Sequence, residues 1–222
     1  MNPVWEACGD VEHDGWASLR LFLSGYAFER QGRSPDYAPA ATDTVDEMRA
    51  RPLAANVAAE AWTCFAQKLN NEGLNHANNP LCPRGVRYVR HYGGQPIEST
   101  TCELSAVEFA AQLQEPLVAW ARDKIQKGQA PEAHGQLRSI CGIDVKIASL
   151  FLRDVGVRYK LAPVNHRYLL QPIDTWVEFV IKRLAQDEAM DRTACAKFIV
   201  GLSLIHISEP TRPLYISYAV FC

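Results

Sequence analysis

The sequence lacks the features that mark membrane-spanning, secreted and disordered proteins. No stretch of its 222 residues approaches the roughly 18 uninterrupted apolar residues of a spanning helix. Residues 1–14 contain no basic head followed by an apolar run, so we expect no signal peptide. Hydrophobic residues make up 48% and charged residues 22% of the chain, as in an ordinary globular protein of one domain or two small subdomains.

Cysteine is scattered along the chain rather than paired. The seven cysteines stand at positions 8, 64, 82, 102, 141, 195 and 222, and no C-x-x-C occurs. This spacing excludes a zinc ribbon and a thioredoxin motif. We therefore interpret most of the thiols as small buried apolar groups and expect a reducing, cytoplasmic compartment.

The net charge of the chain is only −2, so the overall charge does not indicate a nucleic-acid partner. Its distribution is uneven. Residues 1–136 carry 12 Lys and Arg against 17 Asp and Glu, whereas residues 137–201 carry 10 against 7. A local basic excess can steer a polyanion even when the total is neutral, although chance variation in composition explains the difference equally well.

Residues 202–222, LSLIHISEPTRPLYISYAVFC, resemble the in-frame translation of a sequencing-library adapter. Pro213, Leu214 and Tyr215 depart from that translation and occupy the place of a sample index. The alternative is a genuine C-terminal strand, since the segment holds isoleucine and valine. We interpret residues 202–222 as a non-native tail and residues 1–201 as the natural helical domain, whose own C-terminus would then be missing.

Helical periodicity dominates the remainder of the chain. Expected helices cover residues 16–29, 44–51, 53–69, 106–114 and 117–127, followed by helices that Asp174 and Asp191 can cap and that end near Leu184 and Val200. Ser105 and Glu108 have the spacing of a capping box. Residues 70–85 and 128–135 are expected to connect helices, and residues 86–92 to form one basic helical turn. Because strict two-residue alternation is scarce, the predicted fold class is all-α.

The segment 137–150, LRSICGIDVKIASL, has the pattern of two short helices joined by a glycine-containing turn. Gly142 lies in the turn, and Lys146 opens the second helix. Such a turn points unpaired backbone N–H groups outward at a helix N-terminus, where the helix dipole is positive. The pattern therefore predicts a phosphate-binding site that needs no net basic charge.

These residues resemble the helix-hairpin-helix of the HhH-GPD superfamily of DNA base-excision glycosylases. The matching positions are Leu137, Ile140, Gly142, Ile143, Lys146 and Ala148, followed by the segment QPIDTWV at 171–177. The resemblance covers about residues 104–184. It implies a two-subdomain helical fold with a cleft between the subdomains and the hairpin at the mouth of the cleft.

The resemblance also implies roles for individual residues. Lys146 is expected to be the nucleophile that displaces the damaged base and forms a Schiff base, the mark of a glycosylase with AP lyase activity. Asp174 is expected to stabilise the positive charge that develops on the sugar. The backbone of Gly142, Ile143, Asp144 and Lys146 is expected to bind DNA phosphate.

Cofactors and partners follow from the same resemblance. In relatives, carbonyls of the hairpin loop hold a monovalent cation, and the matching positions are Arg138, Ile140 and Ile143. Some relatives carry an iron–sulfur cluster on four cysteines beyond the point where this chain stops, so the sequence leaves that cofactor open. The implied partner is double-stranded DNA with a damaged base, an oxidised purine among the candidates. No membrane is expected, and the protein is expected to be monomeric, and nucleoid-associated if prokaryotic.

Two departures from the family pattern bear on these expectations. Asp144 replaces the second glycine of the hairpin. Aspartate tolerates left-handed backbone, but its carboxylate would repel a phosphate bound nearby. The segment 158–169, RYKLAPVNHRYL, lengthens the connection and must loop out for Asp174 to return to Lys146.

Alternatives remain open at this stage. A non-catalytic helix-hairpin-helix module that only grips the DNA backbone would need neither Lys146 nor Asp174, and a helical scaffold protein would use the loop as a simple connection. Tyr26, Phe28 and Trp16 are interpreted as core aromatics, with stacking on an extruded base as the alternative. If C-terminal helices are missing, we expect an exposed apolar face on the N-terminal part of the chain.

Overall fold

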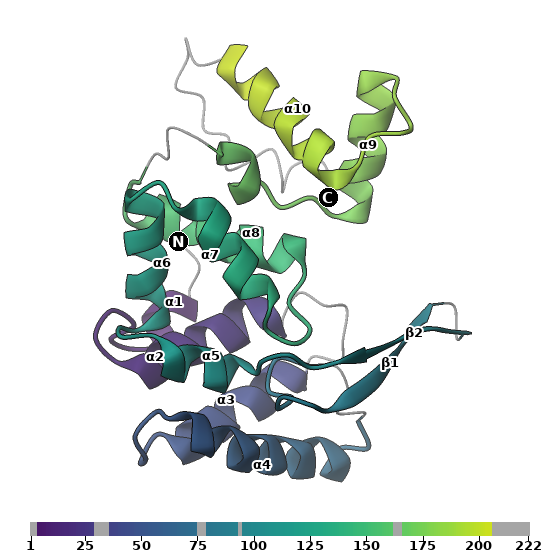
Figure 1. Cartoon of the computed structure of the whole chain (residues 1–222). Helices are drawn as coiled ribbons and strands as arrows, with labels where there is room; N and C mark the ends of the chain where they lie inside the picture. The colour runs from purple at the N-terminus through teal and green to yellow at the C-terminus, as the bar shows by residue number, and fades with distance from the viewer. Residues whose placement is uncertain (1–3, 29–35, 75–78, 93–94, 162–165, 206–222) are drawn as a thin grey trace. The chain divides into compact units, whose positions relative to one another are not determined.

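The computed structural model describes residues 4–28, 36–74, 79–92, 95–161 and 166–205. The chain divides into two compact units, Met1–Pro172 and Ile173–Cys222. Most of the described residues are helical, as the sequence predicts (Figure 1). Most of the predicted non-native tail, residues 206–222, lies outside the described residues.

The first unit is a set of helices around one apolar core, with a β-hairpin attached. Its helical segments are α1 (Val4–Ala7), α2 (Gly15–Phe22), the π-helical turn η1 (Leu23–Ala27), α3 (Tyr37–Met48), the 3-10 turn η2 (Ala55–Val57), α4 (Ala58–Asn71), α5 (Ala106–Gln112), α6 (Leu117–Gln126), α7 (Ala130–Arg138), α8 (Val145–Arg158) and the 3-10 turn η3 (Arg167–Leu170). The strands are β1 (Arg87–Tyr92) and β2 (Gln95–Thr101).

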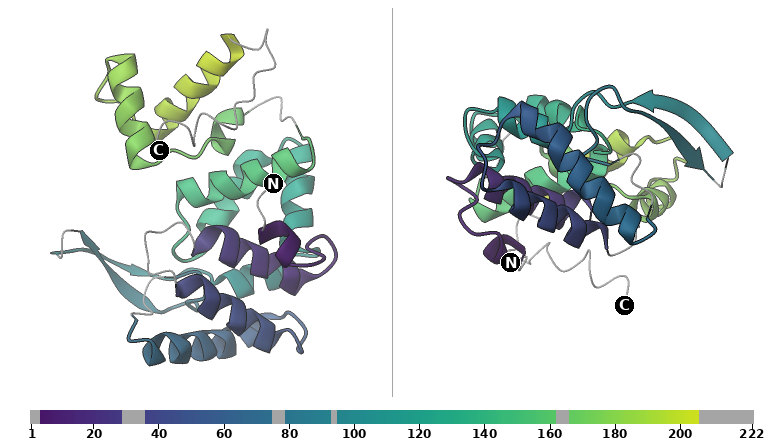
Figure 2. Two further views of the ribbon diagram at one scale, coloured as in Figure 1. Left: turned by 180° about the vertical axis from the view of Figure 1, so that it is seen from behind. Right: turned by 90° about the horizontal axis from the view of Figure 1, so that it is seen from below.

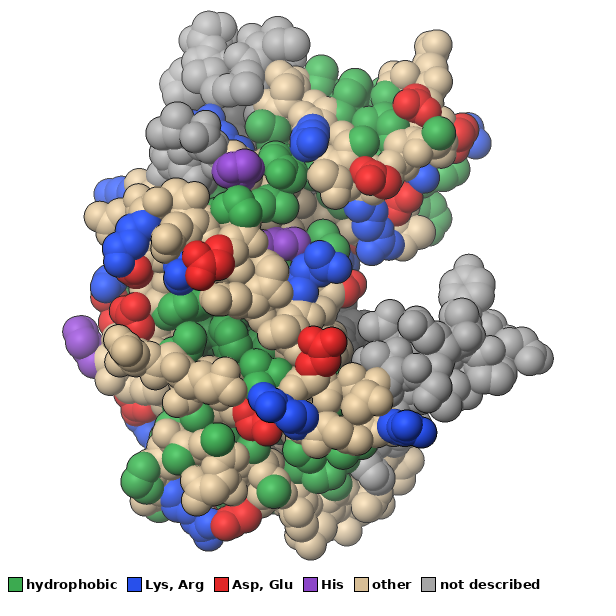
Figure 3. Space-filling model, viewed as in Figure 1, with side chains coloured by type: hydrophobic (Ala, Val, Ile, Leu, Met, Phe, Trp, Pro, Cys, Tyr) green, Lys and Arg blue, Asp and Glu red, His purple; other side chains and the backbone are tan. Residues whose placement is uncertain are grey.

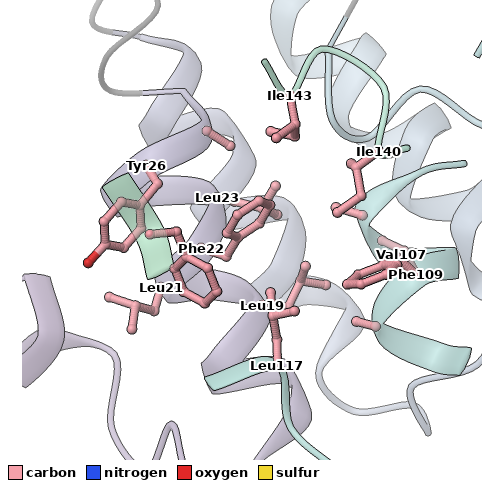
Figure 4. Packing of buried hydrophobic residues seen from close by; sticks show 14 of the residues in the cluster. Leu19, Leu21, Phe22, Leu23, Tyr26, Val107, Phe109, Leu117, Ile140 and Ile143 are labelled. Carbon is pink, nitrogen blue, oxygen red and sulfur yellow. The ribbon is translucent and has the colours of Figure 1, made fainter. Parts of the chain in front are cut away.

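The apolar run in α2 and η1 forms the centre of this core. Leu19, Phe22, Leu23 and Tyr26 are fully buried, and Figure 4 shows them among side chains from α5, α6 and the loop before α8. The core interpretation of Trp16, Phe28 and Tyr26 is confirmed by their burial.

Tyr26 also closes a small polar network inside the core. Its hydroxyl accepts a hydrogen bond from the indole nitrogen Nε1 of Trp5 at 2.9 Å and donates to Oδ2 of Asp154 in α8 at 3.2 Å. The ring packs edge-on against Phe151, with the ring centroids 5.3 Å apart. A buried hydroxyl with both partners satisfied suits a structural position.

Local capping signals predicted several helix ends correctly. The hydroxyl of Ser105 accepts from the Glu108 backbone at 3.1 Å, and the Glu108 carboxylate accepts from the Ser105 backbone at 2.8 Å, so the capping box of α5 is confirmed. At the end of α4, Gly73 has φ +67° and the N–H of Leu74 returns to the carbonyl of Leu69. This geometry is typical of a helix C-terminal cap, and α4 ends where the expected connection over residues 70–85 begins.

One helix start depends on a residue far away in the sequence. α6 follows Pro116, which supplies no capping side chain. The N–H of Val118, in the first turn of α6, instead donates to the hydroxyl of Ser18 in α2 at 2.7 Å. Ser18 is fully buried, so one of the unpaired donors of α6 is satisfied by tertiary structure.

The predicted helical turn over residues 86–92 was wrong. Those residues form β1, which pairs antiparallel with β2 in a register that sets Arg87 opposite Thr101 and Arg90 opposite Glu98. The β-hairpin formed by β1 and β2 projects from the helices of its unit (Figure 2). The strands are rich in tyrosine, valine, isoleucine and threonine, which favour extended backbone.

The predicted connector over residues 128–135 was also wrong, because α7 begins at Ala130. Pro131 suits the first turn of a helix, where its missing N–H costs nothing. Gly135 lies inside the helix despite its low helix propensity. Ala133 and Leu137 are completely buried, and this packing outweighs the propensity of a single glycine.

The second unit contains α9 (Thr175–Ala185) and α10 (Arg192–Ile205). Asp174 and Asp191 cap these helices as predicted. Glu178 in α9 pairs with Arg192 at the start of α10 at 3.0 Å. The hydrogen bond from Lys182, followed by the one from Arg192, lowers the pKa of Glu178. α10 continues past the predicted end at Val200.

The expected apolar face on the N-terminal part is not seen in the described residues, since the large side chains of α2 and η1 are buried. Exposed apolar side chains gather instead on the second unit, over α9 and α10 (Figure 3). The described large apolar side chains that are exposed are Val157, Trp176, Phe179, Val180, Leu184 and Leu202. Within the described part of the chain, no helix has the length and apolar character needed to cross a bilayer.

Candidate functional site

The predicted helical hairpin is present as α7, a tight turn and α8. The turn is closed by a hydrogen bond from the Ile143 N–H to the Ile140 carbonyl at 3.1 Å. Gly142 lies between them with φ +72°, a left-handed conformation that favours glycine. The sequence pattern therefore predicted both the position of the turn and the residue that permits it.

The turn is held against the rest of the first unit by backbone and side chains. Ile140 forms a parallel bridge with Leu104, and the N–H of Cys141 donates to the Leu104 carbonyl at 2.8 Å. The side chains of Ile140 and Ile143 point into the core (Figure 4). The backbone and the side chains therefore both hold the loop in one geometry.

Asp144 has a role that the family pattern did not predict. Its backbone is extended, with φ −98° and ψ 178°, so the tolerance of aspartate for left-handed backbone is not needed here. Its carboxylate caps α8 by accepting from the Ile147 N–H at 2.9 Å. The side chain thus places a negative charge at the helix N-terminus and uses one of the donors that a phosphate would otherwise contact.

Lys146 lies in the first turn of α8 and is half-buried. The next residues, Ile147 and Ala148, are buried in the core and fix the rotation of the helix. A shallow hollow nearby is lined by residues that include Gln136 and Ser139 of the hairpin, but Lys146 is not among them. The lysine is therefore at the predicted place on the hairpin and outside this hollow.

Asp174 caps α9 in the same way that Asp144 caps α8. Its carboxylate accepts from the Val177 N–H at 2.9 Å, and the residue is half-buried. Asp174 belongs to the second unit and Lys146 to the first, so each is placed within its own unit. The segment 162–165 of the long connection lies outside the described residues, and His166 precedes η3 with φ +61°.

The carbonyl groups predicted to hold a monovalent cation come from the end of α7 and the turn. Arg138 is the last residue of α7, where carbonyls lack partners within the helix. The carbonyl of Ile140 accepts from Ile143 and retains a second lone pair. Carbonyl oxygens at a helix C-terminus suit a hard monovalent cation, so Arg138, Ile140 and Ile143 remain candidates for that role.

A buried histidine in the hairpin was missed at the sequence level. His134 in α7 is 5% exposed, and its Nε2 lies 3.2 Å from the hydroxyl of Ser149 in α8. Burial lowers the pKa of His134, because desolvation disfavours the charged imidazolium. The periodicity of α7 could have indicated this position only if the segment had been recognised as a helix.

The interpretation of the cysteines as buried apolar thiols holds for Cys8, Cys82 and Cys195, which are buried and unbonded. It fails for Cys102 and Cys141, which form a disulfide. Their 39-residue separation gives no sequence signal, because the pairing follows from the way the turn is fixed beside the end of β2. Burial raises the pKa of the remaining thiol nearby, Cys82, to about 11.

No family model matches the chain, and searches of curated proteins and of solved structures find no match either. On the face shown in Figure 3, basic and acidic side chains are interspersed. The features of the chain that bear on function are therefore the hairpin and the segment around Asp174.

Proposed function

We propose that the protein is a DNA base-excision glycosylase with AP lyase activity. The observation that carries the proposal is the hairpin itself: a left-handed Gly142 closes the turn, and Lys146 follows in the first turn of α8. Asp174 supports the proposal as a half-buried carboxylate at the start of the next long helix. The helix-hairpin-helix of DNA base-excision glycosylases has the same order of features.

The hairpin would bind DNA through the phosphates of the DNA backbone. α8 has 14 residues, and its N-terminal N–H groups and helix dipole favour an anionic ligand. Asp144 satisfies the Ile147 N–H, and the N–H groups of Cys141 and Ile143 donate within the protein, so the phosphate donors would be the N–H groups of Asp144 and Val145 at the start of α8. The loop is fixed to Leu104, so binding would order little additional backbone.

The reaction begins with attack of the neutral Lys146 amine on the anomeric carbon of the damaged nucleoside. The bond from this carbon to the base breaks, and its electron pair leaves with the base. Loss of the amine protons and opening of the sugar ring give a Schiff base. Removal of a proton from the adjacent carbon then expels the 3′ phosphate and cleaves the strand. The Asp174 carboxylate stabilises the cationic sugar in the first step.

Borohydride trapping tests the lysine directly, because the hydride reduces the Schiff base to a stable protein–DNA crosslink. We expect the purified chain to be trapped on duplexes that carry an oxidised purine or an abasic site. Lys146→Ala should abolish trapping while leaving duplex binding in place. Lys127→Ala is a matched control, since Lys127 is an exposed helix-end lysine paired with Asp123.

The results separate this proposal from a non-catalytic DNA-binding module. Trapping that persists in Lys146→Ala would remove the assignment of Lys146. Tight duplex binding without any trapping across the panel of damaged bases would favour the module. If the chain is not trapped and does not bind the duplexes, the hairpin is a simple helix–helix connection.

A further inference from the structure

Three cysteine sulfurs meet behind the hairpin turn. The Sγ atoms of Cys82, Cys102 and Cys141 all lie within 4.8 Å of one another, and all three residues are buried. They form a separate small cluster, against which Trp62 and Val86 pack. Three cysteine sulfurs from three distant segments of the chain therefore converge at one buried point.

The backbone fixes each of these cysteines independently. Cys82 ends a turn in which its N–H donates to the carbonyl of Asn79 at 3.0 Å. Cys102 exchanges backbone hydrogen bonds with Val86 and Gly85 at 2.9 Å each, and the Cys141 N–H donates to Leu104. The three sulfurs are therefore held near one point without any help from a ligand.

We propose that the reduced protein binds one Zn²⁺ ion through the thiolates of Cys82, Cys102 and Cys141. Tetrahedral zinc–thiolate sites have Zn–S bonds of about 2.3 Å, which place neighbouring sulfurs roughly 3.8 Å apart. The three Sγ atoms already lie within 4.8 Å of one another, so a small opening of the Cys102–Cys141 pair would produce this geometry. Water or a small ligand completes the coordination. The proposal is independent of glycosylase activity.

The disulfide and the metal site exclude each other. In the disulfide form the sulfurs of Cys102 and Cys141 are bonded to one another, and only the Cys82 thiol remains. A dithiol reductant breaks this bond by transferring two electrons and two protons and itself becomes a disulfide. Zinc then displaces three thiol protons as it binds. The ion would tie β2, the Asn79–Cys82 turn and the hairpin together, as the disulfide ties two of them.

The test uses the full chain, reduced with dithiothreitol, stripped with a chelator and desalted without oxygen. Zn²⁺ alone is then titrated against a chromophoric chelator. We expect one Zn²⁺ per chain with a Kd of about 1 μM or tighter. Reoxidised chain, in which the Cys102–Cys141 bond is verified by mass spectrometry, should bind at least about 100-fold more weakly.

Cys82→Ser should weaken Zn²⁺ binding by about 100-fold or more, because one ligand is lost. Cys195→Ser is the control: it removes an equally buried thiol from the second unit and should have no effect on Zn²⁺ binding. Co²⁺ substitution in the unaltered chain keeps the test decisive if a variant fails to fold, since thiolate-to-cobalt absorption should correspond to three thiolates. Substoichiometric binding, equal binding by the oxidised chain, or absorption from fewer than three thiolates would overturn the proposal.

Discussion

The backbone N–H of Cys141 donates to the carbonyl of Leu104, and this single hydrogen bond joins the turn of the helical hairpin to the strand-like segment after β2. The same segment leads directly into the capping box of α5. The hairpin turn is therefore part of the core of the first unit. Substitutions in the turn should affect folding as well as function.

Asp144→Asn should strengthen duplex binding about fivefold at low salt, because it removes one charge near the phosphate site and keeps a capping side chain on α8. Asp144→Gly should strengthen binding similarly but lower the free energy of unfolding by a few tenths of a kcal/mol. Fluorescence anisotropy and urea denaturation measure the two effects. Unchanged affinity in both variants would mean that DNA does not dock at the N-terminus of α8.

Asp174→Asn separates the observed capping role of this aspartate from the catalytic role proposed for it. Asparagine is as good a cap as aspartate, so α9 should keep its stability, whereas single-turnover base excision should fall by about 100-fold or more. Asp174→Ala should lose excision and also about 1 kcal/mol of stability. Normal turnover in Asp174→Asn would show that the residue is only a cap.

Gly142→Ala should lower the free energy of unfolding by about 1–2 kcal/mol, because alanine resists the left-handed conformation at φ +72°. Gly135→Ala provides a matched control in the neighbouring helix. Gly135 has open space around its α-carbon, so alanine there should stabilise α7 by about 0.5–1 kcal/mol. Chemical denaturation of both variants checks that the free energy of unfolding falls in Gly142→Ala and rises in Gly135→Ala.

Acid should destabilise the first unit partly through His134. Its folded pKa lies below the ordinary value of about 6.5, so the unfolded state binds more protons as the pH falls through that value. The unfolding free energy should therefore decrease from about pH 6.5 down to the lowered pKa, below which this contribution levels off. His134→Gln should flatten the pH dependence in that window.

Features encoded by neighbouring residues were predictable from the sequence, and features that depend on distant contacts were not. The Ser105–Glu108 capping box and the turn at Gly142 each follow from a few adjacent side chains. The helical state of Gly135 and the pairing of Cys102 with Cys141 arise only from tertiary packing. The strands β1 and β2 had a local signal in the Gly93-Gly94 dipeptide between them, which is typical of hairpins.

Only part of the candidate site was predictable from the sequence. The place of Lys146 on the hairpin and the cap at Asp174 follow from the motif. The extended backbone of Asp144 does not follow from the motif. The neighbouring residues of the motif are the same whether this position holds a glycine or a capping aspartate. The convergence of Cys82 with the other two cysteines required the folded chain, since turns and strands far apart in the sequence supply its members.

The hydrogen bond from Val118 to Ser18 makes the start of α6 dependent on a residue 100 positions earlier. A helix completed in this way gains little from forming early, since closing so long a loop costs entropy before the contact is made. The first turn of α6 should therefore become protected against hydrogen exchange only when α2 is docked. The two helices should open as one cooperative unit, and the Val118 amide would report on the slowest opening of the fold.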